Sequence, residues 1–273
     1  MIRSIVLLWS LGPLLWQLYT SLRPADALVS SPLGLGDPGG GLLSGWTLEN
    51  YRQLLAADPP FWRYLFNSAV VGVAGTGLTL LLAIPCAYGL QQQRGALRWG
   101  TLALLLAASL FPTALLFLAL LEWARQLGLA NHLLALALPY AALSLPLAIL
   151  LLRAALADLP PELEDAARLE GLGPLQRLRF VLLPLLAPAI ASTAILVFLF
   201  SWSEYPIALT WISRESLLSL SAAIARIGAS SVFTIPYGAF AAATVLGSLP
   251  LVLLLLLFQR AIVSGLTQGA VKG

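Results

Sequence analysis

The chain has 273 residues, of which 59% are hydrophobic and 10% are charged. Soluble domains carry about 25% charged residues, so this chain has too little polar surface to cover a water-soluble body of its size. Its net charge of +3 comes from dispersed basic residues, which argues against nucleic acid as a partner. The composition therefore predicts a protein that folds in a lipid bilayer.

Six segments are apolar enough, and close enough to the roughly 20 residues that a helix needs, to cross a bilayer. They run over residues 4–22, 64–90, 99–121, 132–152, 185–211 and 238–260. The first could instead be a cleaved signal peptide, because Arg3 precedes it and Ala25-Asp26-Ala27 follows it. Its apolar stretch, however, is longer than the usual core of about 7–15 residues, which favours an uncleaved span. The sequence thus predicts an all-α, polytopic membrane protein with six spans in a single domain over residues 1–273.

The distribution of basic residues predicts the orientation of these spans. With six spans both termini lie on one side, which holds nine arginine and lysine residues, while the other side holds six. The positive-inside rule therefore places both termini in the cytoplasm. The densest basic group, from Arg168 to Arg179, lies in one loop of that side.

Three of the loops between the spans are long, two on the outer side and one on the cytoplasmic side. Residues 23–61 form an outer loop rich in Gly, Pro and Ser, with a short interfacial helix expected near residues 48–51. Residues 212–237 form the second outer loop, and residues 153–184 form the cytoplasmic one. The tail after the last span covers residues 261–273, because Arg260 is expected to end that span at the membrane surface.

Several kinds of site are excluded by the residues that are missing. A P-loop needs a lysine followed by Ser or Thr, whereas the single lysine, Lys272, precedes the terminal Gly273. One histidine, His132, and one cysteine, Cys86, cannot supply an ordinary His/Cys metal site. The acidic residues lie mostly in loops, so catalysis by paired carboxylates is not expected either. We therefore expect no enzyme activity, metal or cofactor in this chain itself.

The cytoplasmic loop contains the most informative stretch, residues 159–173. Pro160 and Pro161 suit the start of a helix, where a missing N–H costs nothing, and the acids that follow suit the positive end of the helix dipole. Gly171 is typical of a helix stop. The pattern predicts a short helix of about three turns.

One face of this helix is expected to be flat. Leu163, Ala166, Ala167 and Glu170 share that face by their spacing of three and four residues. A helix that lies on lipid headgroups would carry larger apolar residues than the two alanines. The residues alone leave open whether this helix lies on the membrane or docks to a cytoplasmic partner.

The same stretch resembles a known family motif. Glu164-Asp165-Ala166, Gly171 seven residues after Glu164, and Leu183-Pro184 resemble the EAA loop of binding-protein-dependent ABC importers. The pattern of that loop is Glu-Ala-Ala, three residues, Gly, nine residues, an apolar residue, one more residue, and Leu-Pro. The sequence departs from it at Asp165, where Ala is usual, and at Glu170, where sugar permeases usually have Asp.

Further segments resemble the carbohydrate permeases of these importers along nearly the whole chain. They are Trp46-Thr47-Leu48-Glu49-Asn50-Tyr51, Phe66-Asn67-Ser68, Ala87-Tyr88-Gly89, Leu145-Pro146 and Ser201-Trp202-Ser203-Glu204-Tyr205. The ending from Gly265 to Gly273 is similar to the tail of the smaller permease subunits of maltose and trehalose transporters. The resemblance implies import of an α-glucoside of the maltose or trehalose kind by alternating access. The alternatives are a permease for glycerol phosphate or another sugar, and a channel or scaffold without an ATPase.

The resemblance also implies partners and site residues. The partners are a second permease, a cytoplasmic ATPase dimer that holds ATP and Mg, and an extracytoplasmic sugar-binding protein. Contact with the ATPase is implied for Glu164, Asp165, Ala166, Ala167, Glu170 and Gly171, and for Gln268 and Lys272 of the tail. Contact with the sugar-binding protein is implied for Gly228, Ala229, Ser230 and Ser231, against the alternative of a plain surface loop.

Two residues near the outer end of the fifth span could line the substrate path. Glu204 is an acid in a predicted span, and such residues are functional candidates because a charge in the membrane is costly. It could instead lie hydrated at the interface or pair with Arg214. Trp202 could stack on a sugar. The alternative is that Trp202, Tyr205 and Trp211 form an aromatic belt at the membrane surface.

Overall fold

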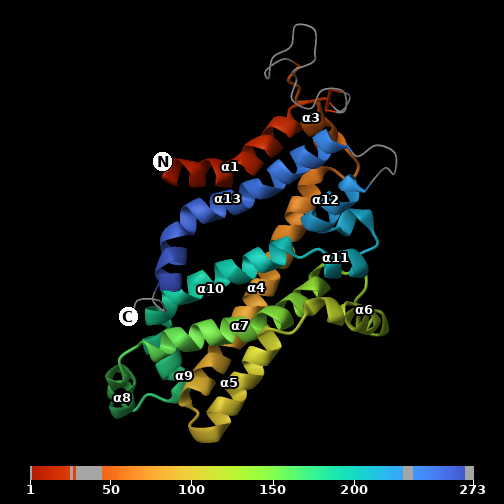
Figure 1. Ribbon diagram of the computed structural model, residues 1–273. Coiled ribbons are helices and arrows are strands. Elements are labelled where there is room, and N and C mark those ends of the chain that lie inside the picture. Colours follow the sequence, from red (N-terminus) through yellow and green to blue (C-terminus); the bar gives the residue numbers. More distant parts are fainter. Residues whose placement is uncertain (1, 25–26, 29–44, 230–235, 268–273) are drawn as a thin grey trace. The chain divides into compact units, whose positions relative to one another are not determined.

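The protein is described by a computed structural model that covers residues 2–24, 27–28, 45–229 and 236–267 (Figure 1). Within these residues the regular structure is helical and contains no β-strand. The predicted all-α fold is therefore confirmed. The chain divides into two compact units, Met1–Ser68 with Ser213–Leu254, and Ala69–Ile212 with Leu255–Gly273.

The first unit is held together by buried amide and hydroxyl side chains. It contains α1 (Ile2–Ser21), α3 (Glu49–Ala56), η4 (Glu215–Leu217) and α12 (Leu220–Gly228), with the first residues of α4 (Phe61–Gln92) and most of α13 (Tyr237–Thr267). Asn50 of α3 donates hydrogen bonds to the carbonyl oxygens of Ser21 and Arg23, at 2.9 and 2.8 Å. Asn67 of α4 donates to the carbonyls of Ser216 and Leu218 at 3.1 and 2.9 Å. These amides satisfy backbone groups where helices end.

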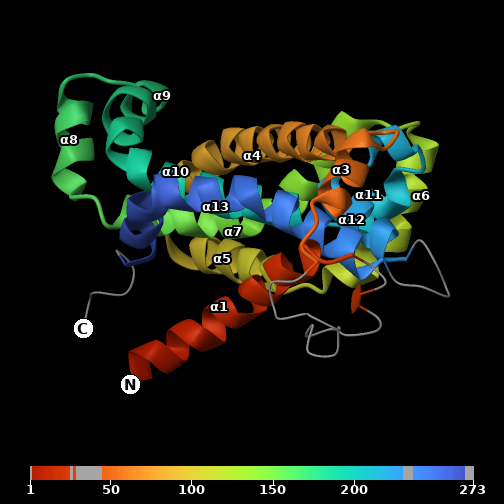
Figure 2. The ribbon, with the colours of Figure 1, turned by 90° about the horizontal axis from the view of Figure 1, so that it is seen from above.

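The second unit is a bundle of helices. It contains the rest of α4, α5 (Gly95–Ser109), η1 (Thr113–Leu116), α6 (Phe117–Gln126), η2 (Leu133–Leu136), α7 (Ala137–Ala157), α8 (Pro161–Leu169), α9 (Pro174–Arg177), a π-helical turn (Leu178–Leu182), α10 (Leu183–Ser203) and α11 (Pro206–Trp211). Buried aliphatic side chains of α4, α7 and α10, including Ala87, Leu152 and Leu186, form its core. Helices α8 and α9 lie at one end of α7 and α10, and α6 and α11 lie at the other end (Figures 1 and 2).

Four of the helices in the described ranges are long and apolar enough to cross a membrane. They are Phe61–Gln92, Leu133–Ala157, Pro174–Ser203 and Tyr237–Gln259, and Gly95–Ser109 is a shorter apolar helix. These correspond to the predicted second to sixth spans. The predicted first span corresponds to α1, a helix of 20 residues. A helix near residues 48–51 is present as α3, and its position at the membrane surface stays a prediction.

The predicted third span, 99–121, is wrong as a single helix. Helix α5 ends at Ser109 and a new helical segment begins at Thr113. The break falls at Pro112, which has no N–H and whose ring clashes with the carbonyl four residues earlier in a continuous helix. Proline therefore divides an apolar stretch that hydropathy alone joins.

The boundaries of the last two spans also differ from the prediction. Helix α10 ends at Ser203, Glu204 is extended with ψ 127°, and Pro206 starts the separate helix α11. Proline is favoured at the first position of a helix, so it begins α11 instead of only bending one long helix. At the other end of the chain, α13 continues through Arg260 to Thr267. Arg260 therefore does not end the last helix, and residues 261–267 of the predicted tail are helical.

Two glycines of α4 provide a matched test of packing in the second unit. A Cβ on Gly72 would lie 2.7 Å from Cε2 of Phe198 in α10, whereas nothing lies within 4 Å of a Cβ on Gly77. We expect Gly72→Ala to destabilise the protein by about 1–3 kcal/mol, the usual cost of overpacking. Gly77→Ala should change stability little or increase it. Thermal unfolding of both variants in detergent checks this, and equal midpoints would contradict the close contact.

Candidate functional site: the loop helix α8 and its polar network

The predicted loop helix exists and begins and ends as its residues suggest. Helix α8 covers Pro161–Leu169, with proline at its start, Glu162 and Glu164 in the first turn and Arg168 in the last. Gly171 follows with φ +78°, a left-handed conformation that glycine adopts without strain. The N–H of Leu172 donates to the carbonyl of Ala167 at 3.1 Å, so the helix ends in a Schellman motif.

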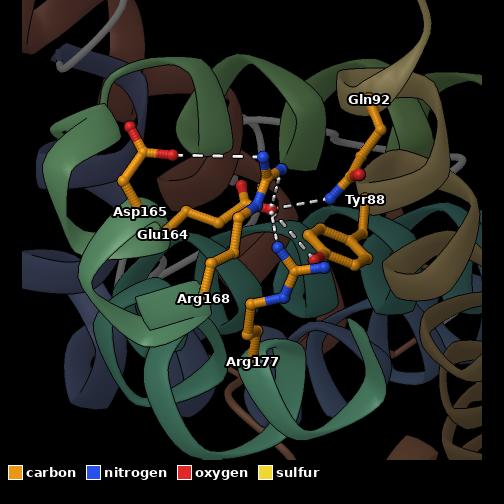
Figure 3. A network of polar contacts seen from close by, with 6 residues as sticks. All are labelled: Tyr88, Gln92, Glu164, Asp165, Arg168 and Arg177. Atoms are coloured by element: carbon orange, nitrogen blue, oxygen red, sulfur yellow. Dashed lines mark hydrogen bonds and ion pairs between the residues drawn. The ribbon is translucent and has the colours of Figure 1, made fainter. Parts of the chain in front are cut away.

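Glu164 is the centre of a polar network (Figure 3). Its Oε1 accepts hydrogen bonds from the Tyr88 hydroxyl at 3.2 Å and from Gln92 Nε2 at 2.8 Å, both on α4. It also forms ion pairs with Arg168 of α8 at 3.1 Å and with Arg177 of α9 at 3.0 Å. The network thus joins three helices, and Tyr88 lies 76 residues before Glu164 in the sequence.

The pair of Glu164 and Arg177 is partly withdrawn from water. The side chain of Arg177 is 9% exposed and that of Glu164 is 22% exposed. A charge in such a position is strongly destabilising when it loses its partner, by about 3–5 kcal/mol for a fully buried pair. The pair between Arg168 and Glu164 is more exposed, at 52% for the arginine, and contributes less. Arg177 therefore holds Glu164 in its inward position.

A cavity of about 530 Å³ borders this network. Its walls come from the end of α4, the end of α7 and the start of α8, and include Gln91, Arg94, Leu156, Pro160, Asp165 and Arg168. Apolar packing between α4 and α8 is therefore incomplete at this end of the second unit. The hydrogen bonds from Tyr88 and Gln92 to Glu164 connect the two helices beside that space.

The outward face of α8 differs from the one that helical spacing alone selected. Ala167 is buried at 6% exposure and therefore lies against its own chain, which corrects its predicted place on a flat docking face. Asp165, Ala166 and Glu170 are exposed, and Leu169 is 91% exposed. Helix α8 packs on α9 and the π-helical turn, which accounts for the side that carries Ala167. The outer surface thus combines acids with an exposed leucine.

The register of the motif also changes. A pattern of three residues between Ala and Gly, counted back from Gly171, selects Asp165-Ala166-Ala167, one residue later than the predicted start at Glu164. The structure is consistent with Asp165 as the first residue of the motif, because the Asp165 side chain is 71% exposed while Glu164 faces inward. Asp165 rather than Glu164 is the acid available at the surface.

Trp202 and Glu204 occupy well-defined places at the other end of the second unit. Trp202 is 5% exposed and its ring packs on Phe198 with centroids 5.5 Å apart. Glu204 accepts hydrogen bonds from the Tyr140 hydroxyl at 2.7 Å and from the backbone N–H groups of Ile207 and Ala208 at 2.9 and 3.3 Å. Its carboxylate therefore lies at the N-terminus of α11, where the helix dipole favours an anion. A role of either residue in a substrate path stays a prediction.

The suggested aromatic belt near these residues is wrong for two of its three members. Trp202 and Trp211 are buried at 5% and 4% exposure, while Tyr205 is 45% exposed. Side chains in a belt would face the membrane surface. Both tryptophans instead contribute to the interior of the second unit.

The remaining predicted contact residues are only partly covered. Gly228 is the last residue of α12, and the N–H of Ala229 donates to the carbonyl of Ala225 at 3.1 Å. Ser230 and Ser231 lie outside the described residues, as do Gln268 and Lys272. Their proposed contacts stay predictions.

Sequence reasoning missed three members of the Glu164 network. Tyr88 and Gln92 lie four residues apart on α4, which places them on one face of that helix. The sequence places Arg177 in the basic group from Arg168 to Arg179 and indicates no partner for it. No local pattern connects Tyr88 and Gln92 to Glu164, although the arginines 4 and 13 residues after Glu164 are consistent with an ion-pair network.

Residues 61–268 match the family described as the binding-protein-dependent transport system inner membrane component. The chain belongs to this family. It is accordingly a multi-pass permease component of an ABC importer, and ATP is hydrolysed on separate subunits of such systems.

Individual family members are similar over nearly their whole length. The sulfoquinovosyl glycerol transport system permease protein of Agrobacterium fabrum is 36% identical over 99% of this chain and 92% of its own length. The trehalose transport system permease protein of Mycobacterium tuberculosis is 33% identical over 99% of this chain and 95% of its own. The trehalose/maltose transport system permease protein of Thermococcus litoralis is 34% identical over 96% and 92%.

A solved structure agrees with this family at the level of the fold. A chain of a bacterial ABC transporter involved in the import of the acidic polysaccharide alginate matches with a TM-score of 0.75. The match covers 95% of this chain and 93% of that chain at 21% identity. At this identity the likeness supports the permease fold and not a shared substrate.

Proposed function

We propose that the chain is a permease subunit of an ATP-driven importer for sugars of the maltose or trehalose kind. In this proposal it pairs with a second, related permease and receives sugar from an extracytoplasmic binding protein. A dimeric ATPase, which holds ATP and Mg, drives alternating access of the spans. Both termini and α8 lie on the cytoplasmic side.

The observation that carries the coupling part of this proposal is the two-sided character of α8. One side is bound to α4 and α9 through Glu164, while Asp165, Ala166, Leu169 and Glu170 are exposed on the rest of the helix. An exposed leucine near Asp165 and Glu170 suits docking to a protein surface with an apolar hollow and basic residues beside it. Motion of the ATPase would then be transmitted through α8 to the spans.

The sugar class rests on the names of the relatives. Two of them are named as trehalose or trehalose/maltose permeases, which supports an α-glucoside. Another, at 36% identity, is named for sulfoquinovosyl glycerol, and one from Streptomyces coelicolor, at 32% identity, is named for diacetylchitobiose. A different glycoside is therefore the second candidate. All four names concern small molecules with a sugar unit, which favours a sugar over glycerol phosphate.

The test is purification of the tagged chain together with the proteins that bind it, followed by measurement of sugar uptake into proteoliposomes that contain the purified complex. We expect a nucleotide-binding subunit and a second permease to be recovered with it, and ATP-dependent uptake of trehalose or maltose in the presence of the cognate binding protein. Diacetylchitobiose and sulfoquinovosyl glycerol serve as competing substrates. Recovery without an ATPase would favour a channel or scaffold, and uptake of only a competing substrate would replace the α-glucoside.

A further inference from the structure

We infer that Glu164 is a positioning residue that ties the loop helix α8 to the end of α4, so that both helices move as one body during transport. The inference rests on the proposed function in one respect, namely that α8 receives motion from an ATPase. It assigns Glu164 a role inside its own chain, different from the ATPase contact that the resemblance implied.

The first argument is the direction of the Glu164 side chain. The described structure gives Glu164 four hydrogen-bond donors, and two of them, Tyr88 and Gln92, lie on α4 (Figure 3). Its neighbour Asp165 has a side chain that is 71% exposed and lies 4.0 Å from Arg168. Consecutive acids of α8 therefore face in different directions, one toward α4 and one outward.

The second argument is that Glu164 cannot easily exchange these partners for others. Arg177 is nearly enclosed, with a side chain that is 9% exposed, and its guanidinium bonds Glu164 at 3.0 Å. If Glu164 turned outward to an ATPase, it would leave this enclosed positive charge without its counter-ion, which is unfavourable in a site with little water. Glu164 is thus expected to keep its partners throughout the transport cycle.

The third argument concerns what else joins the two helices. Helix α8 packs on α9 and the π-helical turn, but the cavity of about 530 Å³ is lined by residues of both α4 and α8. Where packing is incomplete, directional hydrogen bonds decide the relative position of two helices. The bonds from Tyr88 and Gln92 therefore provide the link through which a displacement of α8 reaches α4, a helix of 32 residues.

The variant that tests this link removes only its α4 side. Tyr88→Phe combined with Gln92→Met deletes both donors on α4 while preserving the size of the side chains and the ion pair of Glu164 with Arg177. Gln91→Met is the matched control, because Gln91 lines the same cavity on the same helix and makes no hydrogen bond to Glu164 in the described structure. All variants are studied in the assembled complex.

Two readouts are needed. The first is the distance distribution between spin labels on the native Cys86, which is exposed on α4, and on a cysteine introduced by Glu162→Cys on α8. The second is the amount of sugar transported per ATP hydrolysed. For the double variant we expect a broader distance distribution and a fall in sugar per ATP of at least about twofold, because each lost hydrogen bond corresponds to a factor of about 2 to 13. The control should behave as the wild type.

The outcomes separate this inference from the proposed function. An unchanged distance distribution in the double variant would overturn the link, whatever the transport rate. A broader distribution with unchanged sugar per ATP would also overturn it, because the link would then have no part in transport. If no ATPase is recovered with the wild-type chain, the proposed function fails, while the distance measurement still decides whether Glu164 ties α8 to α4. If the double variant does not assemble, Tyr88→Phe and Gln92→Met are measured singly, and no broadening in either would reject the link.

Discussion

Replacement of Gly171 by leucine is expected to reduce sugar uptake to the background level, although the chain should still insert in the membrane. Gly171 ends α8 with φ +78°, and an L-residue in the left-handed region costs about 1–2 kcal/mol. A Cβ at this position would meet no atom of the described structure within 4 Å, so leucine has open space in which to project toward the proposed ATPase surface. Uptake by proteoliposomes that contain the whole complex measures the effect.

Two further substitutions at Gly171 separate backbone strain from steric hindrance. Alanine brings the strain with little bulk, while asparagine adopts the left-handed conformation more readily and brings bulk. If the partner surface is close, Gly171→Asn should impair uptake more than Gly171→Ala. The reverse order would assign the effect to the Schellman motif alone. Normal uptake by Gly171→Leu would reject any role of this residue in coupling.

Replacement of Glu204 by alanine is expected to destabilise the second unit by about 2–4 kcal/mol, the sum of a lost helix cap and a buried hydroxyl without an acceptor. The carboxylate accepts from Tyr140, which is 1% exposed, and from two N–H groups at the start of α11. Its loss should release α11 from the end of α10. Thermal unfolding of the purified complex in detergent measures the loss.

Milder changes at the same place show what kind of role Glu204 has. Tyr140→Phe removes one of these three donors, and Glu204→Gln keeps an acceptor oxygen for the helix, so both should cost less than Glu204→Ala. If Glu204→Gln unfolds like the wild type but no longer transports sugar, Glu204 belongs to the substrate path that the sequence suggested. Wild-type stability of Glu204→Ala would contradict the capping role.

The loop helix was predictable because its signals are local. Pro161, the acids that follow and Gly171 lie within eleven residues, and each acts through the backbone of its own helix. The apolar composition of the spans was equally visible. Hydropathy alone did not locate the breaks at Pro112 and Pro206, since the apolar stretch continues through both.

The tertiary part of the site could not be predicted in the same way. Tyr88 lies 76 residues before Glu164, and nothing in either segment specifies the other. The direction of Ala167 and Glu164 depends on which side of α8 meets α9, and helical spacing fixes only which residues share a side. The sequence therefore indicated the helix, but its spacing placed Ala167 on the outward face, and Ala167 is buried.

The π-helical turn at Leu178–Leu182 has a consequence for how the chain tolerates length changes. Such a turn holds about one residue more than an α-helical turn, and each residue of an α-helix advances the side chains by about 100°. The turn therefore sets the rotational phase between Arg177, which must meet Glu164, and the apolar faces of α10, which must meet α7. The turn thus fixes the angle about the helix axis between the side that carries Arg177 and the side of α10 that packs on α7. Deletion of one residue here could leave the helix unbroken, but it would turn either Arg177 away from Glu164 or the apolar side of α10 away from α7.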